Sequence, residues 1–278
     1  MSKNYTIEPL RKLTIDWQEL WRFRELFYFF TWRDIKVKYK QTALGFLWAI
    51  LQPLAMMTVF VLFFSKGLNI PTDDIPAPIF YFTGLMFWNL FSSGLSASAN
   101  SMVSNAEIIK KIYFPRLIVP FSSVLVALFD FLMTLIPFLF LMLYYRLTTD
   151  IVFSFHFLWQ FILALLITII TTIGLGCMIA AWNVKYRDFR YIVPFMIQFL
   201  LFVTPVIYPV TMFDNLPLAQ YILSLNPMTG VMLLARNGFS FNNLPLDLLG
   251  ISTISMFIFL TIGLFTFRKM EAFFADIA

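Results

Sequence analysis

The sequence has few of the residues on which metal sites, disulfides and catalytic centres depend. A single cysteine, Cys177, excludes an internal disulfide and any site with several cysteine ligands. A single histidine, His156, excludes the usual histidine-based zinc, haem and di-iron sites. No G-x-x-x-x-G-K-[ST] run occurs, so the chain has no P-loop for nucleotide. The first 43 residues show no pattern of a cleavable signal peptide. We therefore expect no metal, no cofactor and no catalytic residue within this chain.

Charge is also scarce, and apolar residues take its place. Charged residues make up 13% of the 278 residues, where a soluble domain carries roughly 25%. Hydrophobic residues reach 60%, including 35 phenylalanines. A soluble fold of this size could not bury so much apolar surface. The composition indicates an integral membrane protein.

Six stretches are long and apolar enough to cross a bilayer as helices. A hydrocarbon core about 30 Å thick needs roughly 20 helical residues, and helices are required because unpaired peptide groups in hydrocarbon are costly. The predicted spans are 44–64, 79–103, 117–145, 157–181, 191–210 and 248–267. The expected fold class is an all-α membrane protein with six transmembrane helices.

Lys and Arg are distributed unevenly between the two sides of these spans. Seventeen lie before the first span, after the second, after the fourth and after the last, whereas only Lys66, Arg146 and Arg236 lie on the other side. Because cytoplasmic segments are enriched in Lys and Arg, both termini are predicted to be cytoplasmic. The chain then divides into a cytoplasmic N-terminal segment (1–43), a transmembrane domain (44–267) and a cytoplasmic tail (268–278).

The segment 16–41, before the first span, predicts an amphipathic helix. Large aromatic residues such as Trp17 and Trp21 recur at three- and four-residue steps with charged residues between them. Such a helix is typical of the headgroup layer. The cations of its last turns, Lys36, Lys38 and Lys40, would attract anionic headgroups at about 1 kcal/mol per charge. Two interpretations stay open, a plain interfacial anchor and a working part of a substrate entrance.

The loop after the second span predicts a short amphipathic helix on the cytoplasmic face. Residues 104–107 have the spacing of a capping box, and Pro115 ends the helix. Its apolar stripe, beside Lys110 and Lys111, consists of Ile108, Ile109, Ile112 and Tyr113. Two turns are too short to be stable alone. The helix must therefore dock on a partner or, alternatively, lie on lipid.

The long loop 211–247 predicts two short apolar helices on the outer side. They cover 218–225 and 228–235 and meet at Asn226-Pro227. Each is too short to span a bilayer and too apolar to lie free in water. We expect a re-entrant or interfacial pair, which is tolerated at membrane depth only where protein covers it or where it faces a cavity.

Three features inside the predicted spans each have two interpretations. Asp130 is the one charged residue of the six spans, and it either has a function within the membrane or fixes helix packing through a local hydrogen bond. The serines of 92–101 either allow close helix packing or line a wet path. The aromatic stripe of the fifth span either faces lipid or lines a pore, where its rings could stack on sugars; it consists of Tyr191, Phe195, Phe199 and Phe202.

Five motifs, in order and between the expected spans, resemble a known family. They are residues 32–53 (with Trp32-Arg33-Asp34, Leu44-Gly45, Trp48 and Gln52-Pro53), 105–116, Tyr186-Arg187-Asp188, Thr204-Pro205-Val206-Ile207-Tyr208-Pro209 and Leu225-Asn226-Pro227. From about residue 20 onward, the chain is similar to type-2 ABC exporter permeases of the branch that exports O-antigen, capsule and teichoic acid polymers.

The resemblance implies a half-transporter of the bacterial inner membrane. It would form a homodimer, pair with two separate ATPase subunits that bind ATP and Mg²⁺, and export a lipid-linked glycan through a shared channel. The residues implied for coupling to the ATPase are Glu107, Ile108, Ile109, Lys110, Lys111, Ile112, Tyr113, Phe114, Arg187 and Asp188. The implied substrate entrance consists of Arg33, Lys36, Lys38 and Lys40. Tyr208 joins the four stripe residues as a channel-lining candidate, and Asn226 and Pro227 would form an outer gate.

Two other functions stay open on the sequence. An exporter of a smaller amphiphile or drug could use the same fold, with a dry cleft that opens to lipid in place of a polar tunnel. A membrane glycosyltransferase would act on a lipid-linked sugar without any ATPase.

Overall fold

The computed structural model describes residues 17–40, 45–149, 156–186, 188–239 and 244–277, and every regular element in these ranges is a helix. The elements are α1 (Trp17–Arg22), α2 (Arg24–Tyr39), α3 (Leu47–Phe60) with its π-helical continuation η1 (Val61–Gly67), α4 (Ala77–Ser104), α5 (Ala106–Lys111), α6 (Ile118–Thr148), α7 (Phe157–Lys185), α8 (Phe189–Val203), the 3₁₀ turn η2 (Val210–Phe213), α9 (Pro217–Ser224), α10 (Pro227–Asn237) and α11 (Leu246–Ile277).

Four continuous helical segments are long and apolar enough to cross a membrane. They are Leu47–Gly67, Ile118–Thr148, Phe157–Lys185 and Leu246–Glu271, and they coincide with the first, third, fourth and sixth predicted spans. The bent pair α9 and α10 would be a fifth crossing if the two helices formed one broken span. The second predicted span is α4, which is long but more polar, and the fifth is α8, which is short. Four of the six predicted spans therefore coincide with helices that are long and apolar enough to cross a membrane.

The fifth predicted span is wrong in its C-terminal boundary. The helix was expected to continue to residue 210, but α8 has 15 residues and ends at Val203. Thr204 precedes Pro205 and adopts an extended conformation, with φ −76° and ψ 138°. A residue before proline avoids the α region, and this explains why the helix stops there.

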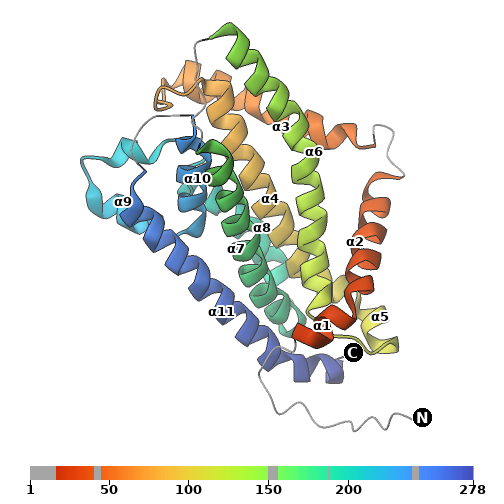
Figure 1. The fold of residues 1–278 in the computed structure, drawn as a ribbon. Coiled ribbons are helices and arrows are strands. Elements are labelled where there is room, and N and C mark those ends of the chain that lie inside the picture. Colours follow the sequence, from red (N-terminus) through yellow and green to blue (C-terminus); the bar gives the residue numbers. More distant parts are fainter. Residues whose placement is uncertain (1–16, 41–44, 150–155, 187, 240–243, 278) are drawn as a thin grey trace.

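The central helix of the bundle is α4, which packs against α6 and α7 (Figure 1). Its first half, from Ile79 to Phe91, is almost entirely buried and supplies most of the aromatic core. Its second half approaches its neighbours closely through small residues. A Cβ atom on Gly94 would meet Thr172 at 2.8 Å, and a Cβ on Gly176 of α7 would meet Ser98 at 2.7 Å or less. Packing through small residues holds α4 in one position.

The predicted helix over 16–41 is two helices. The break lies at Phe23, between α1 and α2. Helix α2 follows α6 in the same direction, because Phe27 contacts Phe121 and, three turns later, Tyr39 contacts Phe129. Figure 1 shows α2 standing beside the lower part of α6. Its angle to the bundle is therefore set by contacts with α6 along its length.

The two ends of the bundle have different structures. At one end, α1, α5 and the last turns of α11 gather around a second apolar cluster that includes Phe30, Phe114 and Phe267 (Figure 1). We call this the α5 end. At the other end, the chain bends by 105° between α9 and α10. Helix α10 is buried between α4, α7 and α11. We call this the α10 end.

Candidate functional site

One face of α4 is polar over four turns. Asn89, Ser93, Ser96, Asn100 and Ser104 follow each other at steps of three or four residues, which places them on one side of a helix. None of the five is fully buried. The small residues of 92–101 are thus divided between two faces of α4, since Gly94, Ser98 and Ala99 are buried. The packing interpretation applies to the buried face, and a wet path along the polar face stays a prediction.

The polar face of α4 forms the wall of two adjoining hollows. One, of about 740 Å³, lies at the α5 end and is also lined by Arg33, Asp34 and Glu107. The other, of about 440 Å³, lies deeper in the bundle between α2, α3, α4, α6 and α8. Ser93 and Ser96 line both. Together the two hollows form one polar groove along α4, from the α4–α5 junction towards the middle of the bundle.

Asp130 of α6 lies in the wall of the deeper hollow and binds the end of α2. Its two carboxylate oxygens accept hydrogen bonds from Lys38 Nζ and from the Tyr39 hydroxyl. Lys38 also forms an ion pair with this carboxylate. Burial, and then the hydrogen bond to Asp130, raise the pKa of the Tyr39 phenol. Asp130 therefore joins α6 to α2 through an ion pair and a hydrogen bond, and not through the local hydrogen bond considered from the sequence. Sequence reasoning missed Tyr39 as its partner, because the two lie 91 residues apart.

The four predicted entrance cations do not form one cluster. Arg33 donates to Asp34 and, at 2.7 Å, to Asn105 Oδ1 at the α4–α5 junction. Lys38 is paired with Asp130. Lys36 is exposed, with Nζ 5.4 Å from the centroid of the Trp32 ring, and Lys40 is exposed as well. Two of the four cations are thus engaged within the fold, and two present their charge on its surface.

The predicted coupling helix is shorter than expected, and its N-terminal cap is different. Helix α5 has six residues, and Ile112 is already extended. The capping box is wrong, because Ser104 belongs to α4 and donates to the Asn100 carbonyl oxygen at 3.0 Å, while Asn105 makes no capping bond through its side chain. Glu107 is exposed and lies 3.8 Å from Lys111, a surface pair worth little.

The residues predicted for coupling fall into an exposed and a covered group. Ile112 and Tyr113 are 60% and 82% exposed, and Lys110 is exposed beside them. Ile108 and Ile109 pack partly against the apolar cluster of the α5 end. Phe114 is 5% exposed and contacts the Phe30 ring, so it positions the segment and is not itself available at the surface. The surface that α5 offers is formed by 107 and 110–113.

The second predicted coupling motif lies at the start of α8. Asp188 is exposed and precedes the first residue of this helix. Arg187 lies outside the described residues. Nearby, the buried Asn183 of α7 donates to the Ala99 carbonyl oxygen at 2.8 Å and to Asn100 Oδ1 at 3.1 Å. These two bonds tie the end of α7 to α4.

The predicted aromatic stripe is one exposed face of α8. Tyr191, Phe195, Phe199 and Phe202 are between 58% and 83% exposed. Tyr208 does not belong to this face. It lies beyond the end of α8, and its hydroxyl donates to the carbonyl oxygens of Phe202 and Val203. Tyr208 therefore supplies a hydrogen-bond donor to carbonyl oxygens at the C-terminal end of α8, while the other four residues form an exposed surface.

Asn226 and Pro227, predicted as an outer gate, form the start of α10. Asn226 is its N-cap: the side-chain oxygen accepts from Met228 N at 3.0 Å, and Nδ2 donates to Thr204 Oγ1 at 2.7 Å. Pro227 is buried at the first helical position, where proline is preferred. The bond to Thr204 attaches the joint between α9 and α10 to the segment that follows α8.

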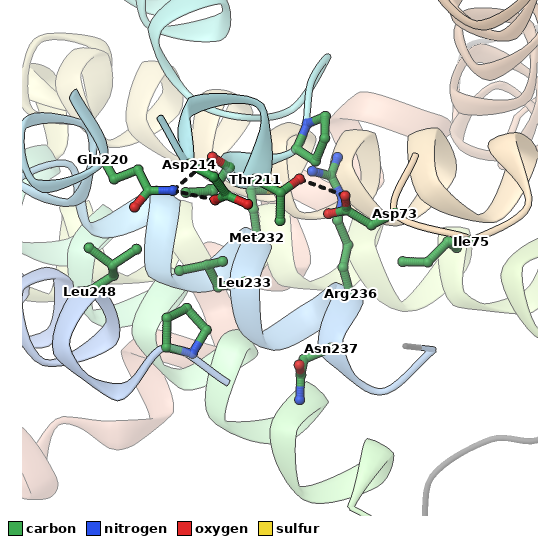
Figure 2. A pocket seen from close by; sticks show the side chains of 13 residues that line it. Asp73, Ile75, Thr211, Asp214, Gln220, Met232, Leu233, Arg236, Asn237 and Leu248 are labelled. Atoms are coloured by element: carbon green, nitrogen blue, oxygen red, sulfur yellow. Dashed lines mark hydrogen bonds between the residues drawn. The ribbon is translucent and has the colours of Figure 1, made fainter. Parts of the chain in front are cut away.

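A pocket of about 260 Å³ lies at the α10 end, and Figure 2 shows Arg236 in its wall. The Arg236 side chain comes from the last turn of α10 and is 7% exposed. It donates to the carbonyl oxygens of Pro205 at 2.6 Å and Val206 at 2.7 Å, in the segment after α8. In the same wall, Thr211 donates to Asp73 at 2.6 Å. Sequence reasoning placed Arg236 only among three cations on one side of the spans and missed its contacts with the segment after α8. Its position at the end of a short apolar helix is the signal that could have found it.

Comparison with known proteins agrees with this architecture. Residues 25–240 match the family described as "ABC-2 type transporter". The chain is 32% identical over 221 residues to the O-antigen export system permease protein RfbA of Myxococcus xanthus, covering 77% of this chain and 80% of the relative. It is 28% identical to RfbA of Klebsiella pneumoniae, covering 88% and 92%. It is 25% identical to the polysialic acid transport protein KpsM of Escherichia coli, covering 86% and 91%. The chain belongs to the ABC-2 type transporter family of membrane permeases.

Proposed function

We propose that this chain is the membrane-spanning subunit of an ATP-driven exporter, which moves a lipid-linked polysaccharide of the O-antigen, capsule or teichoic acid type outward from the cytoplasm. The polar groove along α4 carries this proposal. Each buried hydroxyl group without a partner costs free energy, so a glycan needs hydrogen-bonding groups along its path through hydrocarbon. The groove offers serine and asparagine side chains at regular steps over four turns of α4.

In this proposal the α5 end faces the cytoplasm of a bacterium and the α10 end faces outward. The excess of Lys and Arg near α5 supports that orientation. All six predicted helices cross the inner membrane, with α4 and α8 as the second and fifth. One copy leaves the groove open on one side, and a second copy closes it. The exposed aromatic face of α8 then lies along the shared path, where flat rings stack on sugars of many kinds.

Energy comes from two separate ATPase subunits, which bind the ATP and Mg²⁺ that this chain has no P-loop to hold. The surface formed by 107 and 110–113 is their docking site. It combines exposed apolar side chains, Ile112 and Tyr113, with the charges of Glu107 and two lysines. Arg33 Nη2 donates to Asn105 Oδ1 at 2.7 Å and so joins α2 to the start of α5. Displacement of α5 therefore also moves α2, which lies beside the groove.

The double variant Ile112→Asp with Tyr113→Asp tests the docking site. Both side chains are exposed, so the chain should fold, whereas two carboxylates in an apolar contact should prevent co-purification with the ATPase and stop transport. Leu216→Asp is the matched control, because Leu216 is 61% exposed near the α10 end. Undiminished complex and transport in the double variant would refute the docking role. Glycan export by vesicles that contain this chain as their one protein would refute the proposed function itself.

A further inference from the structure

The contact between Lys38, Tyr39 and Asp130 closes the deeper hollow at the end of α2. Lys38 and Tyr39 lie in the last turn of α2, and each donates a hydrogen bond to one oxygen of the Asp130 carboxylate. The three side chains form part of the wall of the 440 Å³ hollow, opposite the polar face of α4. The end of α2 is therefore fastened to α6 at the side of a cavity, where the buried Tyr39 ring also packs against Phe46 and Phe129.

The hollow has the size and the chemistry of a binding site for an anion with attached sugars. Its volume lies within the range of about 300–1,000 Å³ typical of small-molecule sites. It presents one ammonium group, Lys38, which is paired with the Asp130 carboxylate in the same wall, together with hydroxyl and amide groups from Ser93, Asn89 and Gln52, and the Trp48 side chain. Ammonium groups bind diphosphates through strong charge-assisted hydrogen bonds. The groove connects the hollow to the α5 end, through Ser93 and Ser96.

The two members of the ion pair are not equally free to leave it. The Lys38 side chain is 48% exposed and can move, whereas the Asp130 side chain is 19% exposed and is fixed on α6. Removing Lys38 without replacement would leave a largely buried carboxylate short of a positive partner, which is unfavourable. A diphosphate that attracts Lys38 offsets the lost pair, and the hydrogen bond from Tyr39 to Asp130 breaks when the end of α2 moves.

We propose that the Lys38–Asp130 ion pair is a latch on a diphosphate site: a diphosphate in the groove replaces Asp130 as the partner of Lys38, and the end of α2 then moves away from α6. This inference rests on the proposed function, since a lipid-linked glycan is the source of the diphosphate. The part of α2 from Phe30 to Arg33 stays in place during this exchange, because Arg33 holds Asn105 and Phe30 contacts Phe114. The turn of α2 after Arg33 thus moves, and the hollow opens beside Lys38.

Spin labels on the full-length chain in lipid nanodiscs test the latch without the ATPase. Val37→Cys on α2 and Leu132→Cys on α6 are 74% and 46% exposed at the natural residues, whereas the natural Cys177 is completely buried and should not react. We expect farnesyl diphosphate to lengthen the distance between the two labels by several ångströms. Asp130→Asn should show the longer distance before any ligand is added. Lys38→Gln should bind farnesyl diphosphate at least about tenfold more weakly and show no ligand-dependent change.

Three comparisons make the result decisive. Lys36→Gln, on the exposed side of the same helix, should keep the ligand-dependent change of distance. Inorganic pyrophosphate should produce the same change if the anion suffices, and a response to farnesyl diphosphate alone would mean that the lipid chain delivers the diphosphate; both results support the latch. A change caused by farnesol, or equal affinity of Lys38→Gln and the natural chain, would overturn it. Because no ATPase is present, failure here leaves the proposed export function standing.

Discussion

The guanidinium carbon of Arg236 lies 3.5 Å from the centroid of the Phe80 ring, so that α10 and α4 are joined by a stacked cation inside the bundle. The same guanidinium donates to carbonyl oxygens of Pro205 and Val206, which no helix satisfies because α8 ends at Val203. One side chain thus connects α4, α10 and the irregular segment after α8. Backbone without helical hydrogen bonds is tolerated at membrane depth only when other groups satisfy it.

Arg236→Lys should destabilise the protein although it keeps the charge. A lysine cannot stack as a plane or donate to two carbonyl oxygens as a fork, and each lost hydrogen bond to a charged donor is worth about 1.5–3 kcal/mol. We expect a clear fall in the midpoint of thermal unfolding in detergent. Arg190→Lys is the control, since Arg190 is exposed near the start of α8. Equal midpoints for the two variants would contradict the role assigned to Arg236.

Close backbone contact between α7 and α11 predicts a second effect on stability. A Cβ atom on Gly263 would lie 1.9 Å from the Gly174 carbonyl oxygen, so Gly263→Ala forces the two helices apart. Overpacking of this kind costs about 1–3 kcal/mol or more. Gly250→Ala, on the same helix α11, meets no atom within 4 Å and should be neutral or stabilising by up to about 1 kcal/mol. Calorimetry of both variants checks the difference, and a Gly263→Ala protein as stable as Gly250→Ala would show that α11 can shift.

The long spans could be predicted from the sequence, whereas the pairing of charged residues could not. Runs of apolar residues determine which helices can cross a membrane, and these runs located α3, α6, α7 and α11. Local turn chemistry was partly misjudged, since Ser104 bonds back within α4 and Thr204 ends α8 before Pro205. Lys38 and Asp130 meet across 92 residues of sequence. No local pattern contains that contact, so the sequence does not distinguish the two entrance cations that are bound within the fold from the two that are not.

The short helix after α4 could be located from the sequence, but the exposed side chains of the segment predicted for coupling could not be identified. Ile109, Tyr113 and Phe114 have similar apolar character, and helical periodicity assigned the first two to one stripe. The structure ends α5 at Lys111, so that Tyr113 extends from the bundle while Phe114 turns inward onto Phe30. The direction of each side chain depends on an extended residue, Ile112, that a continuous helix would not contain.

Tyr113→Ala should therefore weaken the complex with the ATPase, whereas Phe114→Ala should destabilise the fold. Tyr113 is 82% exposed, so its truncation should change the free energy of unfolding by no more than about 0.5 kcal/mol while weakening the complex with the ATPase. Phe114 is buried, and its truncation should cost about 3–5 kcal/mol. Thermal unfolding and co-purification, measured on the same preparations, separate the two effects. A stable Phe114→Ala protein that cannot bind the ATPase would instead place Phe114 directly in the contact.

The polar groove predicts that added bulk on α4 should block transport without unfolding the protein. Ser93 and Ser96 line both hollows, so Ser93→Leu and Ser96→Leu replace hydroxyl groups by apolar bulk in the path. A few misplaced methyl and methylene groups in a site cost about 10–200-fold in rate, and we expect glycan export to fall by at least about tenfold. Thr58→Leu is the matched control, because Thr58 is exposed on α3 and lines neither hollow. Export is measured as surface glycan in cells that produce equal amounts of each variant. If both serine variants export at the rate of Thr58→Leu, the glycan does not pass along this face of α4, and the path must lie against the aromatic face of α8 instead.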